Sequence, residues 1–192
     1  IKEGILSATE KLAVQETKKQ TSQTEQTTET EENDIVGISD GKYAYGCLDD
    51  ETKKVYDEIL HVILQQQESI MVSTLDETVL DLAYCAVNAD YGGLFWVSGY
   101  QYTRYMVGDQ QTGLAFSPQY TMSYEERQNM QASIDASVDQ ILSGISITDS
   151  DYDKAKYVYE KLIQTVDYVP DAANNQNIIS VFLGGQTVCQ GY

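Results

Sequence analysis

The chain has 192 residues, of which 42% are hydrophobic, and its net charge of −18 comes from 30 acidic and 12 basic residues. This composition suits one compact domain plus a tail. The charge argues against nucleic acid and against anionic lipid as partners, because both bind clustered Lys and Arg. No apolar run approaches the roughly 20 residues of a membrane span.

The first 40 residues differ in composition from the rest. Residues 15–34 contain no apolar residue, Gly or Pro and are mostly Thr, Gln and Glu, so they cannot bury enough surface to offset the entropy of ordering. We therefore predict a disordered acidic stalk over 1–40, with a weakly amphipathic helix at 5–14. Such stalks are common on exported proteins, but the composition also suits a disordered tail of any protein. Because the first residue is Ile1 and not Met, we interpret the chain as trimmed at its N-terminus or as a fragment, so the lack of a signal or anchor in it excludes neither.

Two helices are predicted next. In 49–66, apolar side chains recur at helical spacing behind Asp49 or Asp50, either of which can cap the helix. The second helix, 74–88, opens with the capping-box pattern of residues 73–76. Its apolar face is expected to consist of Leu75, Val79, Leu82 and Ala86.

The pattern then changes from helical to extended. Residues 94–107 are rich in aromatic and β-branched side chains, and 114–120 can return as a second strand. The stretch between them, 108–113 (GDQQTG), has the composition of a turn. A turn longer than two residues leaves the register of the hairpin open.

Three further helices complete the predicted order. Ser123 and Glu126 form a capping box before the first, and Ser150 opens the second, which ends before Pro170. The run 178–183 suits a short buried helix with a glycine C-cap. Together with the hairpin, these helices predict an α+β domain. The helix after Ser150 is expected to pack through Tyr152, Ala155, Tyr159, Leu162, Ile163 and Val166.

Metal and cofactor sites have little support. The only His, His61, lies on the first helix, where a partly buried structural role is favoured over a ligand role. The sequence has no CxxC and no HExxH. Asp149, Asp151 and Asp153 stand where a helix begins, which favours the helix dipole, and they lack the glycine and distal Glu of an EF-hand. We therefore predict no metal and no cofactor.

The three cysteines have different surroundings. Cys85 lies on a largely apolar helix and is predicted to be buried. A Cys47–Cys85 disulfide is compatible with an exported protein, but the sequence leaves it open. Cys189 follows Gly-Gly and belongs to no apolar stripe. A helix beginning there would stabilise its thiolate and bind an oxyanion through free N–H groups. The residues alone give one candidate nucleophile with no visible base.

The final stretch, GGQTVCQGY (184–192), resembles the start of the transglutaminase-like core motif. In that motif a small turn precedes Val-Cys-x-Gly-Tyr, and a helix runs on from the cysteine. Further stretches resemble, in this order, bacterial exported proteins of the same family: 89–103, 120–126 and 151–185. The resemblance covers most of 42–192 and is most specific at its C-terminal end.

The resemblance implies that Cys189 is the catalytic nucleophile of a papain-like fold, in which a helix bearing Cys packs on a sheet bearing His and then Asp. In this chain neither follows the cysteine, and His61 precedes it. We therefore expect an N-terminal fragment, inactive by itself. It divides into the stalk (1–40), a mainly helical leading region with a β-hairpin (41–148), and the incomplete start of a papain-like transglutaminase core (149–192).

The family chemistry implies that the Cys189 thiolate attacks a carboxamide or peptide carbonyl to give a thioester. The sequence does not distinguish between cross-linking, deamidation and hydrolysis as the outcome of this reaction. The resemblance also implies a secreted or cell-surface bacterial protein, held at the envelope as a lipoprotein is, with a protein or peptide substrate.

The alternative is a non-catalytic binding or scaffold module that uses a Tyr-rich face at 43–45 and 100–105. The simpler interpretation of these tyrosines is that they cover the hairpin and pack against helices.

Overall fold

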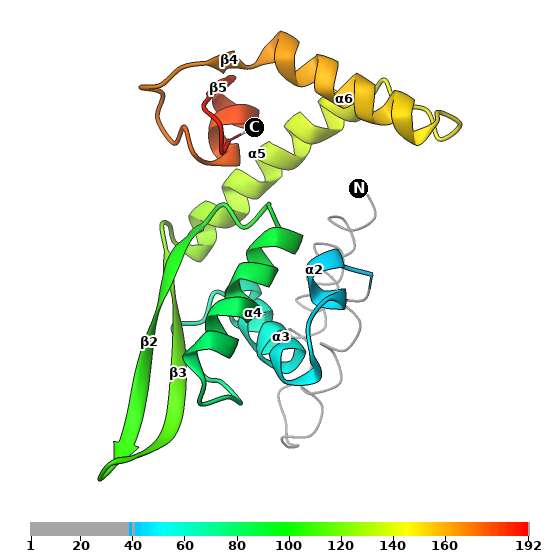
Figure 1. Cartoon of the computed structure of the whole chain (residues 1–192). Helices are drawn as coiled ribbons and strands as arrows, with labels where there is room; N and C mark the ends of the chain where they lie inside the picture. The colour runs from blue at the N-terminus through cyan, green and yellow to red at the C-terminus, as the bar shows by residue number, and fades with distance from the viewer. Residues whose placement is uncertain (1–38, 40, 192) are drawn as a thin grey trace, which may run out of the picture.

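The computed structural model describes residues 39 and 41–191. The predicted stalk and the helix expected at 5–14 lie outside this range, except for Ser39. The elements are α2 (Tyr43–Gly46), α3 (Asp50–Leu64), β1 (Ile70–Met71), α4 (Glu77–Asp90), β2 (Val97–Val107), β3 (Gln110–Tyr120), α5 (Tyr124–Leu142), α6 (Asp151–Thr165), β4 (Asp167–Tyr168), the π-helical turn η1 (Ser180–Gly184) and β5 (Gln186–Thr187). The chain is α+β, as predicted: α2, α3, α4 and the hairpin lie together, and α5 leads from them to α6 and the C-terminal residues (Figure 1).

The predicted first helix is confirmed as α3. Its N-cap is Asp49, whose carboxylate accepts a hydrogen bond from the Thr52 N–H at 2.8 Å. The apolar side chains of α3 are fully buried and pack against α4 and β3. This helix is therefore the centre of the core. The buried apolar residues of α3 are Val55, Tyr56, Ile59, Leu60, Val62 and Ile63.

The predicted second helix starts later than expected. Its N-cap is Asp76, which accepts from the Thr78 N–H at 2.7 Å, so the capping box at 73–76 is not formed. The Thr74 hydroxyl instead donates to Glu51 on α3, at 2.8 Å. The Thr74 hydroxyl thus bonds to a residue of another helix instead of capping its own helix, and α4 begins at Glu77.

The buried face of α4 also differs from the prediction. Leu75 and Leu82 are about half exposed, whereas the helix buries Leu80, Ala83, Ala86 and Val87. Apolar residues occur on α4 at two phases of the helical repeat. Packing against α3 buries the set of apolar residues that contains Leu80. The spacing of apolar residues in the sequence does not show which of the two sets is buried.

The predicted hairpin is confirmed as β2 and β3, and β1 pairs with the other edge of β3. Its turn is shorter than expected, because Val107 pairs with Gln110 and leaves only Gly108 and Asp109 between the strands. Gly108 has a φ of 60°, as the first central residue of a type II′ turn requires. Residues 110–113, predicted as part of the turn, belong to β3. The register set at the turn shifts between Met106 and Tyr105, because Met106 pairs with Gln111 and Tyr105 with Gly113.

The hairpin packs one face on α4. The ring of Tyr100 lies 4.5 Å from that of Tyr84, and its hydroxyl donates to Asp81 at 3.0 Å. The Tyr102 hydroxyl donates to Glu77 at 2.6 Å. These tyrosines of the 100–105 stretch therefore make the contacts that attach the sheet to the helix.

The capping box before α5 is confirmed, with Ser123 and Glu126 each bonded to the other's backbone N–H. Arg127, in the first turn, is buried. Its guanidinium lies 3.9 Å from the Trp96 ring centroid, and Nη1 donates to the Leu64 oxygen at 2.9 Å. Arg127 thus fixes the start of α5 on the core, and the helix leads from there to the C-terminal part (Figure 1).

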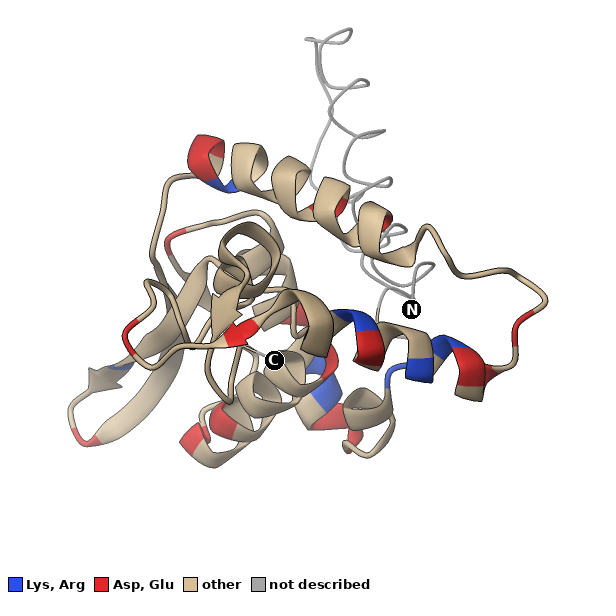
Figure 2. Cartoon of the chain, turned by 90° about the horizontal axis from the view of Figure 1, so that it is seen from above, with Lys and Arg blue, Asp and Glu red and all other residues tan. Residues whose placement is uncertain are grey.

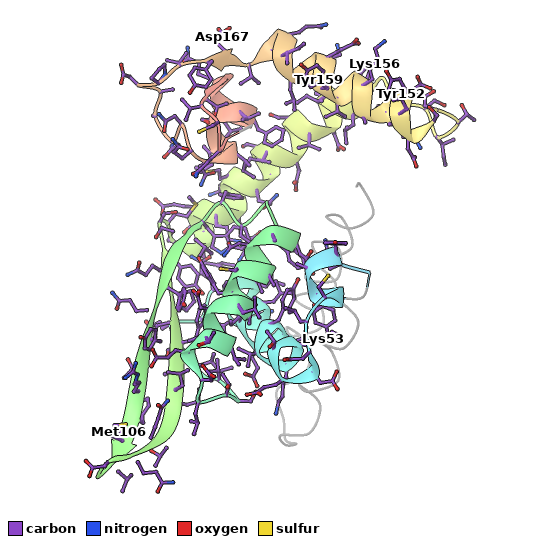
Figure 3. All side chains as sticks on the ribbon, viewed as in Figure 1. Lys53, Met106, Tyr152, Lys156, Tyr159 and Asp167 are labelled. Carbon is purple, nitrogen blue, oxygen red and sulfur yellow. The ribbon has the colours of Figure 1, made fainter. Side chains whose placement is uncertain are left out.

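The cap of α6 is confirmed, since Ser150 accepts from the Asp153 N–H. The predicted packing face is confirmed only in part: Val166 is buried and Leu162 is half-buried, but Tyr152 is 75% exposed and Tyr159 64% exposed. Tyr157, outside the predicted face, is half-buried. Figure 3 shows the side chains of Tyr152, Lys156 and Tyr159 on this helix. α6 contacts α5, and Tyr157 lies against Gly144, just after the end of α5.

Charge is distributed over the described chain as the composition indicates. Figure 2 shows acidic residues at helix ends and in loops, in excess of Lys and Arg. Among the described residues, no helix combines the length and the apolar character needed to cross a bilayer.

Candidate functional site

The segment that leads to Cys189 is held by a short parallel pairing. β4 and β5 pair Asp167 with Gln186 and Tyr168 with Thr187, directly after α6 and before the cysteine. The preceding turn η1 ends at Gly185, whose φ is 61°. The short helical segment with a glycine C-cap was predicted and is confirmed, although most of it is π-helical.

Thr187 anchors this segment from inside. Its side chain is fully buried, and Oγ1 donates to the Asn175 oxygen at 2.8 Å and accepts from the Ser180 hydroxyl at 2.8 Å. The Val188 N–H donates to the same Asn175 oxygen at 3.0 Å. The chain entering Cys189 is thus fixed by side-chain and main-chain bonds.

Gly191 is required by close packing. A Cβ at this position would collide with Thr187 Oγ1 and lie 3.0 Å from the Asn175 oxygen. The Gly191 N–H donates to the Val188 oxygen at 3.0 Å, closing a turn over 189–191. The glycine of the Cys-x-Gly motif therefore allows the chain to fold back on Thr187.

Cys189 lies on this turn with an exposed side chain. Its Sγ is 4.0 Å from Oε1 of Gln176. Residues 189–191 form a turn, so the helix that the resemblance implies from Cys189 onward is not formed over these residues. Cys189 therefore presents an accessible thiol beside the neutral carboxamide of Gln176.

The other two cysteines are also free and exposed. The prediction of a buried Cys85 is wrong, because the residues of α4 that face the core are its neighbours Ala83, Ala86 and Val87. Neither Cys47 nor Cys85 is in a disulfide, the alternative that the sequence left open.

His61 is half-buried in the last turn of α3, which packs against α4 and β3, whereas β5 contacts β4 and η1. The structure therefore brings no His to Cys189 within the described residues.

The acidic clusters act as helix starts. Asp149 accepts from the Ser146 N–H at 2.7 Å, and Asp151 and Asp153 lie in the first turn of α6. Within residues 39 and 41–191, no group of three or more His, Cys, Asp and Glu side chains is placed to hold a metal ion.

A cavity of about 190 Å³ lies beside Cys189, which is not in its lining but contacts the lining residue Gln176. One wall comes from the end of α4 and the loop to β2, and the other from the residues before η1 and after Cys189. Gln176, which contacts Cys189, and Gln190 both line it. The full lining is Asn88, Tyr91, Gly92, Leu94, Phe95, Val97, Gln176, Asn177, Ile178 and Gln190.

No site role is predicted for these carboxamides from the sequence. The Asn/Gln cluster at 174–177 is dense in uncharged polar groups, and this is the one signal that could have indicated the wall. Asn88 lies 88 residues before Gln176, and only the tertiary fold brings the two into one cavity. Burial raises the pKa of Tyr91, also in the lining, to about 12.

No known protein-family model matches this chain, and no curated protein matches it significantly.

Proposed function

We propose that the chain is the N-terminal part of a transglutaminase-like cysteine enzyme with Cys189 as its nucleophile. The observation that carries this proposal is the exposed thiol directly after a buried anchor, Thr187 and Val188. The motif glycine, Gly191, is the residue that permits this turn. The residues that resemble the family motif are thus the ones that present the thiol.

In the proposed reaction, the Cys189 thiolate attacks the carbonyl carbon of a carboxamide or peptide group. The tetrahedral intermediate collapses to a thioester as the C–N bond breaks, and the leaving amine takes a proton from a general acid. A second amine or water then attacks the thioester and releases the cysteine. The second nucleophile decides between cross-linking, deamidation and hydrolysis.

This chemistry requires a base and a group that orients it. His61 is held on α3, away from the elements that β5 contacts. Under this proposal the His and Asp come from residues outside 39 and 41–191, and a chain of residues 1–192 is inactive by itself. The resemblance further supports a secreted or cell-surface location in a bacterium, with an envelope tether of the lipoprotein kind.

The test compares the full-length protein with residues 1–192 in amine incorporation and ammonia release from a glutamine peptide, and in peptide hydrolysis. We expect turnover only in the full-length protein. Cys189→Ala should abolish it, whereas Cys85→Ala, which removes another exposed thiol, should retain it. Undiminished turnover by Cys189→Ala would remove Cys189 as the nucleophile.

A non-catalytic binding module is the second candidate, and one observation favours it. The apolar side of α6 is exposed at Tyr152, Tyr159 and Ile163. Tyr offers apolar area together with a hydroxyl, which suits protein and glycan partners. This candidate requires that the full-length protein shows no Cys189-dependent turnover and that a Tyr152→Ser, Tyr159→Ser variant loses retention on isolated cell envelopes.

A further inference from the structure

The cavity beside Cys189 is lined without a single charged side chain, in a chain of net charge −18. Its polar side chains are the carboxamides of Asn88, Gln176, Asn177 and Gln190 and the phenol of Tyr91. Beneath them lie the buried Leu94 and Phe95. The cavity thus combines uncharged hydrogen-bond donors and acceptors with an apolar floor. This polarity does not depend on the Cys189 thiol.

Two of the four carboxamides are bonded to main-chain groups. Asn177 uses both ends, because Nδ2 donates to the Phe95 oxygen at 2.8 Å and Oδ1 accepts from the Ile179 N–H at 3.0 Å. Asn88 uses Nδ2, which donates to the Tyr84 oxygen at 3.0 Å. Asn177 therefore fixes the wall, and Asn88 is held in a defined orientation.

The remaining hydrogen-bonding capacity of the carboxamides is not used by other described residues. Within residues 39 and 41–191, no hydrogen bond engages Asn88 Oδ1, Gln176 Nε2 or either end of the Gln190 carboxamide. These three side chains are exposed. They offer acceptors and N–H donors to the same small volume.

The size and polarity of the cavity define what it accepts. Its volume of about 190 Å³ is below the roughly 300–1,000 Å³ of sites for whole small ligands, so it suits one side chain. A carboxylate carries only acceptors and would enter the field of a strongly acidic chain, and a Lys would find no carboxylate in the lining. A neutral side chain that both donates and accepts fits best.

We propose that this cavity is a specificity subsite that binds an uncharged polar side chain of a peptide, adjacent to the residue whose carbonyl meets Cys189. This inference rests on the proposed function for the role of Cys189, but the binding itself does not require catalysis. It gives the leading region a part in substrate selection, because Asn88 and the α4–β2 loop form one wall. The reacting carbonyl itself lies outside the cavity.

The test uses nitrogen-15 NMR of the side-chain NH2 groups in the full chain. The probes are capped Gly-Asn-Gly and its near-isosteric, charged counterpart Gly-Asp-Gly, with Gly-Lys-Gly as the cation. We expect only Gly-Asn-Gly to shift the NH2 signals of Asn88, Gln176 and Gln190. The same peptide should slow alkylation of Cys189 by iodoacetamide, a neutral reagent.

Asn88→Asp places a carboxylate on the cavity wall. The variant loses the bond from Asn88 Nδ2 to the Tyr84 oxygen, which orients this side chain. We expect the loss of that one neutral hydrogen bond to weaken Gly-Asn-Gly binding by about fivefold, and the new carboxylate to strengthen Gly-Lys-Gly binding. The matched control is Asn129→Asp on the exposed side of α5, which adds the same charge and should alter neither peptide. Equal responses to the three peptides, or equal effects of the two variants, would overturn the subsite.

A Cys189→Ser variant separates this inference from the proposed function. The NH2 shifts should persist in it, because they report binding without chemistry. If the full-length protein shows Cys189-dependent turnover while Gly-Asn-Gly shifts none of these signals, the subsite is wrong and the function stands. If the shifts occur and turnover is absent, the function fails and the binding site remains.

Discussion

Nδ2 of Asn177 donates a hydrogen bond of 2.8 Å to the main-chain oxygen of Phe95, joining segments 82 residues apart in the sequence. The other end of the same carboxamide accepts from the Ile179 N–H, at the start of the helical turn before Cys189. One side chain thus ties the cysteine-bearing segment to the loop between α4 and β2. The cavity beside Cys189 keeps its shape through this bond.

Replacing Asn177 with Ala should therefore lower the free energy of unfolding. It leaves the Phe95 oxygen and the Ile179 N–H without this partner, which costs about 1–3 kcal/mol. Urea denaturation followed by circular dichroism measures the change. Asn129→Ala, on the exposed side of α5, is the control and should stay within about 0.5 kcal/mol of the parent. Equal losses in both variants would contradict the role of Asn177.

Gly191→Ala tests the packing that presents Cys189. The new Cβ would meet Thr187 Oγ1, so the turn must open or Thr187 must move. We expect a loss of about 1–3 kcal/mol, in the range for overpacked sites, and a changed rate of Cys189 alkylation. Gly93→Ala is the matched control, because a Cβ there meets nothing within 4 Å. An unchanged alkylation rate in Gly191→Ala would show that the turn does not depend on this glycine.

Arg127→Lys should destabilise the start of α5 although it keeps the charge. A Lys ammonium cannot both stack on the Trp96 ring and reproduce the planar donor that reaches the Leu64 oxygen. Trp96 is the only Trp in the chain, so its fluorescence reports this contact directly. We expect a shifted emission maximum and a loss of about 1–2 kcal/mol from the stacked cation and its hydrogen bond. Arg104→Lys, on the exposed hairpin, should leave the emission unchanged.

Stability should fall at alkaline pH because buried phenols resist ionisation. Burial raises the pKa of Tyr120 and of Tyr91 from 10.0 to about 12. Between these values the unfolded chain loses phenol protons that the folded chain retains. The stabilisation is therefore complete below pH 10 and is lost as the pH rises through about 12.

Tyr120→Phe is the variant that checks this dependence. It loses the bond from the Tyr120 hydroxyl to the Gln67 oxygen, which is 2.8 Å long. We expect lower stability below pH 10 but a shallower decline between pH 10 and about 12. Urea denaturation at several pH values, with phenolate absorbance read in parallel, gives both quantities. A decline as steep as that of the parent would show that Tyr120 does not contribute to it.

The sequence by itself determined the local structure of this protein. Asp49, Ser123 and Ser150 cap helices as predicted, and Gly185 ends the helical turn before β5. A cap requires only a side-chain oxygen two or three residues from a free N–H, so the information lies within one turn of helix. The change from helical to extended spacing likewise located the hairpin.

Only the tertiary structure decided which sides of these elements are buried. On α4, contact with α3 buries Leu80 and leaves Leu82 and Cys85 exposed. On α6, the contact with α5 leaves Tyr152 and Tyr159 exposed, although the apolar spacing favoured their burial. Burial depends on which element lies alongside, and residues distant in the sequence set that arrangement. The cavity beside Cys189 has the same origin, because its two walls meet only when the chain folds.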